Sequence, residues 1–170
     1  MRPAHVFGYG SLLEGGAGAP CRLAGHRRVW GVAMDNRRTL PGYKYFLDAA
    51  TGERPAVFVA FLDVVPALGE HVDGVALPSA GLEVLDARER NYRRVHVELD
   101  GLGPAWVYAG RGEARARYER AAAAGRAVVS RAYLEGVRAG FAARGLGFGP
   151  EPEVPVADLV RVDVPPAAPS

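Results

Sequence analysis

The sequence predicts an α+β domain in which a mixed sheet closes into a small β-barrel with flanking helices. Segments rich in β-branched and aromatic residues alternate irregularly with segments of helical periodicity. Turn residues such as Pro41-Gly42, Thr51-Gly52 and Asp100-Gly101 fall between the strand segments. An irregular order of strands and helices is typical of α+β domains, whereas parallel α/β sheets alternate regularly.

Six segments have the composition of strands: Ala4–Tyr9, Val29–Met34, Ala56–Leu62, Val72–Leu77, Tyr92–Leu99 and Ala105–Ala109. Helices are predicted at Ser79–Asn91, Glu113–Ala124 and Ala127–Ala143. In the last helix Val129, Tyr133, Val137 and Phe141 recur every four residues, so they share one face. That face is expected to pack on the sheet.

The chain has 170 residues, of which 49% are hydrophobic and 24% charged, a composition that excludes wholesale disorder and fits one domain. No repeat or interdomain linker interrupts it. Residues 1–164 are therefore expected to form a single domain. The proline-rich residues 165–170 are expected to form a loose tail.

Charge and cysteine content exclude several partners. The 21 basic residues are scattered among 19 acidic ones, with a net charge of +2, so a nucleic-acid partner is not expected. No apolar run reaches membrane-spanning length, no signal peptide is evident, and the single cysteine, Cys21, favours a reducing cytoplasm. Abundant Ala, Gly and Arg with one lysine, Lys44, indicate a bacterial source. The oligomeric state stays open.

The first candidate site follows the first strand. An apolar run breaks into Gly8-Tyr9-Gly10-Ser11-Leu12-Leu13, and glycine is used where a backbone turns sharply or approaches a ligand. The Gly10-Ser11 bend is expected to point its N–H groups outward, as a nest for a carboxylate or phosphate. Two alternatives stay open: Ser11 merely hydrogen-bonds the turn, and Tyr9 packs beneath the loop or presents its hydroxyl to a ligand.

The second candidate site is Glu89. Leu82, Leu85 and Glu89 are spaced three and four residues apart, so a helix would place the carboxyl on its apolar face. Alternatively, Glu89 pairs with Arg93 or Arg94, or lies at a frayed helix end. Asp86 shares this face and is the competing acid. Tyr92 and Arg94 either line a pocket or begin the next strand.

Other motifs are absent. The chain has no Gly-x-Ser-x-Gly, no His-Glu-x-x-His and no cysteine pair, and its four histidines are scattered, so neither a metal nor a cofactor is expected. A dinucleotide fingerprint fails because Leu13 stands where its third glycine would be. The polar residues Asp35–Arg38 with Tyr43-Lys44-Tyr45 form either a surface hairpin or a specificity loop.

Together these segments resemble the γ-glutamylcyclotransferase family. Its N-terminal strand ends in Tyr-Gly-Ser-x-Leu, matched by residues 9–13, and a later helix carries Leu-Asp-x-x-Glu before Tyr-x-Arg, matched by residues 85–89 and 92–94. The resemblance spans roughly residues 5–141. It implies that Glu89 is the catalytic acid–base. It also implies that Tyr9, Gly10, Ser11, Leu12, Leu13 and Tyr92 bind the substrate.

The reaction implied is cyclisation of a small γ-glutamyl amide to 5-oxoproline with release of an amine. The substrate supplies its own nucleophile, so one carboxylate of raised pKa can carry the protons without a metal. The alternative is a binding module that holds a small carboxylate ligand on the same fold without turnover. The leaving amine stays open between an amino acid, a peptide, an ε-linked lysine and a biosynthetic intermediate.

Overall fold

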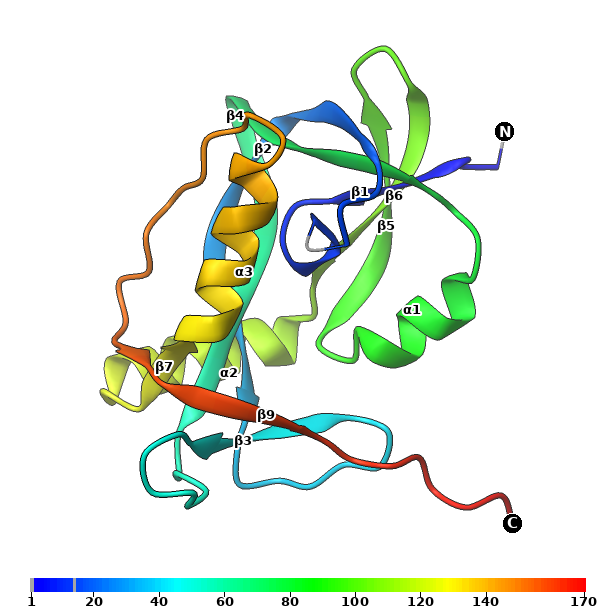
Figure 1. Ribbon diagram of the computed structural model, residues 1–170. Helices are drawn as coiled ribbons and strands as arrows, with labels where there is room; N and C mark the ends of the chain where they lie inside the picture. Colours follow the sequence, from blue (N-terminus) through cyan, green and yellow to red (C-terminus); the bar gives the residue numbers. More distant parts are fainter. Residues whose placement is uncertain (1, 14) are drawn as a thin grey trace.

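In a computed structural model of the chain, which describes residues 2–13 and 15–170, seven strands form one mixed sheet and two form a second (Figure 1). The main sheet consists of β1 (His5–Gly8), β2 (Ala19–Asp35), β4 (Phe58–Pro78), β5 (Tyr92–Leu99), β6 (Gly103–Gly110), β7 (Ala127–Ser130) and β8 (Val156–Ala157). The second sheet pairs β3 (Lys44–Asp48) with β9 (Leu159–Asp163). The predicted α+β class with a mixed sheet is confirmed.

The main sheet has the order β5-β6-β1-β4-β7-β8, with β2 also paired to β4. Strand β1 lies inside this order, parallel to β6 and antiparallel to β4. The loop that follows β1 therefore starts from the interior of the sheet. Closure into a barrel stays a prediction.

Two predicted strands, Ala56–Leu62 and Val72–Leu77, are parts of the single 21-residue strand β4. The residues between them include Pro66 and Gly69, which led to the prediction of a break. These residues pair with β2 on one side. Proline is tolerated in such a segment because the strand needs no N–H donor on its other edge. Bulges between Ala24 and His26 and between Trp30 and Val32 bend this long β2–β4 hairpin.

Three α-helices accompany the sheets: α1 (Leu82–Arg88), α2 (Gly112–Ala123) and α3 (Arg131–Ala142). Helix α1 is shorter than predicted; it follows Gly81, whose φ of 69° favours glycine, and ends at the C-cap residue Glu89. None of the helices in the described residues has the length and apolar character needed to cross a membrane.

The predicted helix at Ala127–Ala143 begins as a short strand and continues as a helix. Residues Ala127–Ser130 form β7, which runs parallel to β4, and its β-branched Val128 and Val129 suit a strand. The Ser130 hydroxyl then accepts a hydrogen bond from the Tyr133 N–H and caps α3. Val137 and Phe141 are fully buried in the core, as their helical spacing predicts, and α3 contacts the loop after β1.

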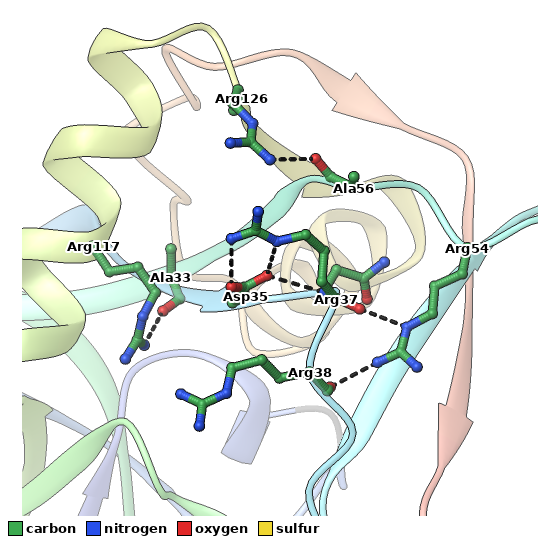
Figure 2. Close-up of polar contacts among 9 residues, drawn as sticks. Ala33, Asp35, Arg37, Arg38, Arg54, Ala56, Arg117 and Arg126 are labelled. Atoms are coloured by element: carbon green, nitrogen blue, oxygen red, sulfur yellow. Dashed lines mark hydrogen bonds and ion pairs between the residues drawn. The ribbon is translucent and has the colours of Figure 1, made fainter.

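The polar segment after β2 is a turn held by arginines (Figure 2). Two nitrogens of the Arg37 guanidinium contact the Asp35 carboxylate, at 2.9 and 2.8 Å. Arg54 donates to the backbone oxygens of Asn36 and Arg38. The buried Asn36 amide pairs with both backbone groups of Phe46, at 2.7 and 2.9 Å. This turn therefore fixes β3, which begins at Lys44.

In Figure 1 the strand β1 near the start of the chain lies in the upper part of the view, and the C-terminal end lies at the bottom. Residues 165–170 have no regular secondary structure, and the carbonyl of Pro165 accepts a hydrogen bond from the N–H of Gly42 at 3.0 Å. The tail thus begins against the loop that precedes β3. The division into a single domain of residues 1–164 and a loose tail stays a prediction.

Candidate functional site

A small cavity lies at the end of β1, and the predicted site residues other than Leu13 line it. Tyr9, Gly10, Ser11 and Leu12 come from the loop after β1, Glu89 from the end of α1, and Tyr92 from the start of β5. The remaining walls are formed by Phe7, Leu62, Tyr108 and Tyr133. The fold thus brings together segments about 80 residues apart in the chain.

The loop after β1 is a 3₁₀ turn, η1 (Ser11–Leu13), that leaves N–H groups available. The N–H of Leu13 donates to the carbonyl of Gly10 at 3.0 Å. No hydrogen bond within the described residues uses the N–H of Ser11 or Leu12. A Cβ on Gly10 would lie 3.2 Å from the Tyr133 hydroxyl, so glycine keeps this corner of the cavity open.

Leu13 anchors the loop after β1 to the core. Its side chain is fully buried in the core, and its carbonyl accepts a hydrogen bond from Arg144 Nη1 at 2.8 Å. Its N–H is used inside the turn, and Leu13 is not among the residues that line the cavity. The predicted substrate contact of Leu13 therefore has no support in the geometry, and the residue packs beneath the site.

The Glu89 carboxyl lies in the cavity wall with 15% of its side chain exposed. Its backbone N–H still donates to the Leu85 carbonyl at 2.8 Å, but its φ of −91° and ψ of 52° end the helix. Burial raises the pKa of this carboxyl, and the positive charges of Arg88, Lys44 and Arg161 partly offset that rise. A carboxyl in this setting binds and releases a proton nearer to neutral pH than an exposed glutamate does.

The ion-pair partner of Glu89 is Arg88, whose Nε lies 3.4 Å from Glu89 Oε1, rather than the predicted Arg93 or Arg94. Arg94 instead pairs with Asp86 at 3.0 Å. The Asp86 carboxylate also accepts a hydrogen bond from the Tyr108 hydroxyl at 2.8 Å and does not line the cavity. Asp86 therefore fixes α1 against β5 and β6.

Two tyrosines form the cavity wall through their rings. The Tyr9 hydroxyl donates to the carbonyl of Tyr108 at 2.5 Å, and the Tyr92 hydroxyl donates to the carbonyl of Leu62 at 2.6 Å. Burial raises the pKa of both phenols well above the usual value, so they stay protonated donors. The packing alternative for Tyr9 agrees with this geometry, and Tyr92 both begins β5 and lines the cavity.

Several lining residues carry no signal in the sequence. Leu62 and Tyr108 lie within strands, where nothing distinguishes them from other core residues. Tyr133 belongs to the predicted apolar face of α3, and its ring packs edge-on against Phe61 with centroids 5.1 Å apart. Only the pairing of distant strands and the packing of α3 bring these side chains to Glu89.

Metal-ligating side chains do not gather in the part of the chain that the structure describes: no group of three among His, Cys, Asp and Glu is placed to hold an ion. Independence from metals and cofactors stays a prediction. Its test is whether activity survives exhaustive chelation.

Comparisons with known proteins bear on the family and the fold of the chain. A model of the family described as "Gamma-glutamyl cyclotransferase, AIG2-like" matches residues 6–127. A solved structure described as "Gamma-glutamyl cyclotransferase" superposes with a TM-score of 0.52 at 15% identity, covering 85% of this chain and 82% of that one. At that identity the likeness shows the fold.

Two further solved structures are more distant. An uncharacterized protein from Homo sapiens is 17% identical, with a TM-score of 0.42, over 64% of this chain and 67% of its own. A protein from Arabidopsis thaliana is 21% identical, with a TM-score of 0.40, over 67% of this chain and 72% of its own. No curated protein matches the chain. Because the family model covers well over half of its residues, including the loop after β1 and Glu89, the chain belongs to the gamma-glutamyl cyclotransferase, AIG2-like family.

Proposed function

We propose that this protein cyclises a small γ-glutamyl amide to 5-oxoproline and releases an amine, with Glu89 as the general acid–base. One observation carries the proposal: the largely buried Glu89 carboxyl lines the same cavity as a loop with two available N–H groups. A proton carrier and an anion-binding loop facing one small space are what this reaction needs. Membership of the family supports the same chemistry.

The reaction joins the substrate's α-nitrogen to its γ-carbonyl carbon and breaks the bond from that carbon to the leaving nitrogen. Glu89, as the carboxylate, takes a proton from the α-ammonium and so frees the attacking lone pair. A proton carried by Glu89 then passes to the leaving nitrogen. Both protons lost from the α-nitrogen end on the departing amine, which leaves as its ammonium, and Glu89 returns to the carboxylate.

The small size of the cavity supports the ring closure itself. Holding the amine and the carbonyl of one molecule together supplies an effective concentration of roughly 10⁵–10⁸ M in favourable cases. The N–H groups of Ser11 and Leu12 would stabilise negative charge on the substrate, either on its α-carboxylate or on the carbonyl oxygen during attack. The rings of Tyr9 and Tyr92 would keep water from the carbonyl.

The test is to incubate the purified chain with a panel of γ-glutamyl amino acids and amides and measure 5-oxoproline. Release of 5-oxoproline together with an equal amount of free amine is the expected result. Saturable binding of these compounds with no product would instead favour the binding module that holds a carboxylate ligand. Neither binding nor product would contradict both functions.

A further inference from the structure

A second cavity adjoins the first and is lined by cations. It shares Ser11, Glu89, Tyr92 and Tyr133 with the first cavity. Its other walls carry the positive side chains Lys44, Arg88, Arg90 and Arg161. Among the described residues, Glu89 is the one carboxylate that lines it. Such a concentration of positive charge beside a buried space favours an anionic occupant.

Lys44 is the cation held deepest in this cavity. Its ammonium lies 4.5 Å from the centre of the Phe61 ring and 5.4 Å from that of Tyr43. Within residues 2–13 and 15–170 it has neither a carboxylate within 4.0 Å nor a hydrogen-bond acceptor. Burial, with the charge of Arg161 adding to it, lowers the pKa of Lys44 to about 8. An anion bound beside the ammonium would stabilise its charge and so raise the pKa of Lys44 again.

The second sheet places Arg161 on the same side as Lys44. In the antiparallel β3–β9 pair, Lys44 lies opposite Asp163 and Phe46 opposite Arg161, and directly opposed side chains share a face. Asp163 contacts Arg161 Nε at 2.7 Å and is mostly exposed. The guanidinium has five N–H donors, and this contact occupies Nε. Its other nitrogens remain to meet a ligand in the cavity that both cations line.

Glu89 fixes which part of the substrate would enter this second cavity. Its carboxyl lines both cavities, whereas Gly10 and Leu12 of the loop line the first alone and the cations Lys44 and Arg161 line the second alone. If Glu89 hands its proton to the leaving nitrogen, that nitrogen lies beside it. The glutamyl part then occupies the loop side, and the substituent on the leaving nitrogen extends towards Lys44.

We propose that Lys44 and Arg161 form a subsite that selects γ-glutamyl compounds whose leaving amine carries a carboxylate. Charge-assisted hydrogen bonds from an ammonium and a guanidinium are among the strongest in proteins, and an amide lacks the negative charge and the second acceptor oxygen that a carboxylate offers them. Arg161 lies beyond the residues 6–127 that the family model matches, so this subsite is completed by the C-terminal strand of this chain. The subsite rests on the proposed cyclisation.

The test compares γ-glutamylglycine with γ-glutamylglycinamide, which differ only in the carboxylate of the leaving amine. The quantity measured is the ratio of kcat/KM for the acid to kcat/KM for the amide, because general damage to an enzyme cancels in that ratio. The wild-type protein is expected to prefer the acid. Lys44→Met keeps most of the length of the side chain without its charge and is expected to lower the ratio by on the order of 10- to 100-fold, the range for losing a charged contact.

Arg161→Gln is expected to lower the ratio in the same direction, which keeps the proposal testable if Lys44→Met fails to fold. Lys44→Arg keeps the charge and is expected to restore part of the preference. Arg27→Gln is the matched control: Arg27 is exposed and lines a different cavity, so the ratio should stay at the wild-type value.

Each remaining outcome contradicts the subsite. If the wild-type ratio is near one and Lys44→Met leaves it unchanged, no carboxylate is recognised there. An equal loss on both substrates in a variant that keeps the wild-type melting temperature would show that the cations hold the glutamyl α-carboxylate instead. If neither compound nor any other γ-glutamyl amide yields 5-oxoproline, the proposed function itself fails, and the subsite with it.

Discussion

Arg88 joins the two halves of the candidate site: its Nε lies 3.4 Å from Glu89 Oε1, and its Nη2 donates to the Ser11 hydroxyl at 3.1 Å. The guanidinium thus contacts both the proposed proton carrier and the loop after β1. Its charge also stabilises the carboxylate form of Glu89, because it lowers the pKa that burial raises. This relationship leads to a prediction about pH.

Removing the positive charge in Arg88→Met is expected to raise the pKa of Glu89 further. Since the carboxylate form accepts the substrate's proton, kcat/KM is lost as pH falls through that pKa. The acidic limb of the profile should therefore move to higher pH in the variant. Measuring kcat/KM against pH checks this.

Arg93→Gln serves as the control for that profile, because Arg93 is exposed and carries the same charge on the neighbouring strand β5. Solvent screens a charge in that position, so the acidic limb of the Arg93→Gln profile should match that of the wild-type protein. If the limb stays in place in Arg88→Met, or moves to lower pH, Arg88 does not act on Glu89.

Gly10→Val is expected to abolish substrate binding, because the new side chain would fill the corner beside the Tyr133 hydroxyl and Leu62. The backbone of Gly10 needs no left-handed conformation, so lost space rather than strain is the cause. Isothermal titration with a γ-glutamyl amide and the melting temperature should be measured together. Wild-type affinity in this variant would contradict the proposed position of the substrate.

Gly15→Val is the matched control for that change. A Cβ on Gly15 would meet no atom of the described residues within 4 Å, and the φ of Gly15 is not positive. Binding and melting temperature are both expected to stay at wild-type values. A loss equal to that of Gly10→Val would mean that any change in this loop removes function.

A buried carboxylate supports the strands behind the site. Asp63 is fully buried and accepts hydrogen bonds from Gly110 N at 2.7 Å, Val64 N at 2.8 Å and Arg115 Nε at 2.7 Å. Asp63→Ala leaves these donors unpaired and should lower the free energy of unfolding by ~3–5 kcal/mol. Urea denaturation measures this loss.

Asp158→Ala is the comparison, since Asp158 makes an equally short contact with Arg131, at 2.6 Å, but both side chains are largely exposed. Water replaces that contact, so the urea midpoint should hardly move. Equal losses in the two variants would mean that burial does not govern the strength of these ion pairs.

Local patterns predicted the elements whose signals lie within one short segment. Strand β5 has the predicted bounds, Tyr92–Leu99, and α2 lies within one residue of its prediction. Local sequence patterns gave wrong predictions where pairing between strands distant in the chain decides the secondary structure. Pairing with β2 keeps β4 continuous through Pro66, and pairing with β4 draws Ala127–Ser130 out of the predicted helix.

The candidate site divides in the same way. Gly10 after β1 and a glutamate spaced with two leucines are visible in the sequence, and both line the cavity. Lys44 and Arg161 are 117 residues apart, and only the β3–β9 pair brings them to Glu89. Asp86 and Glu89 were indistinguishable by helical spacing, whereas the structure places Asp86 against Tyr108 and Arg94.

Asp86→Asn is the control for the central test, because Asp86 belongs to α1 but lies outside the cavity. The amide oxygen can still accept the hydrogen bond from the Tyr108 hydroxyl, while the ion pair with Arg94 is lost. This variant is expected to keep most of the wild-type turnover. It separates loss of a carboxylate from damage to the segment around α1.

The most direct test is the rate of 5-oxoproline release by Glu89→Gln. Glutamine keeps the size of the side chain but cannot accept the ammonium proton, so kcat should fall by ~10²–10⁴-fold, the usual contribution of a general acid–base. The melting temperature should stay the same or rise, because an amide avoids the cost of burying a charge. If Glu89→Gln turns over normally while Asp86→Asn is inactive, the roles of the two acids are reversed and the account is wrong.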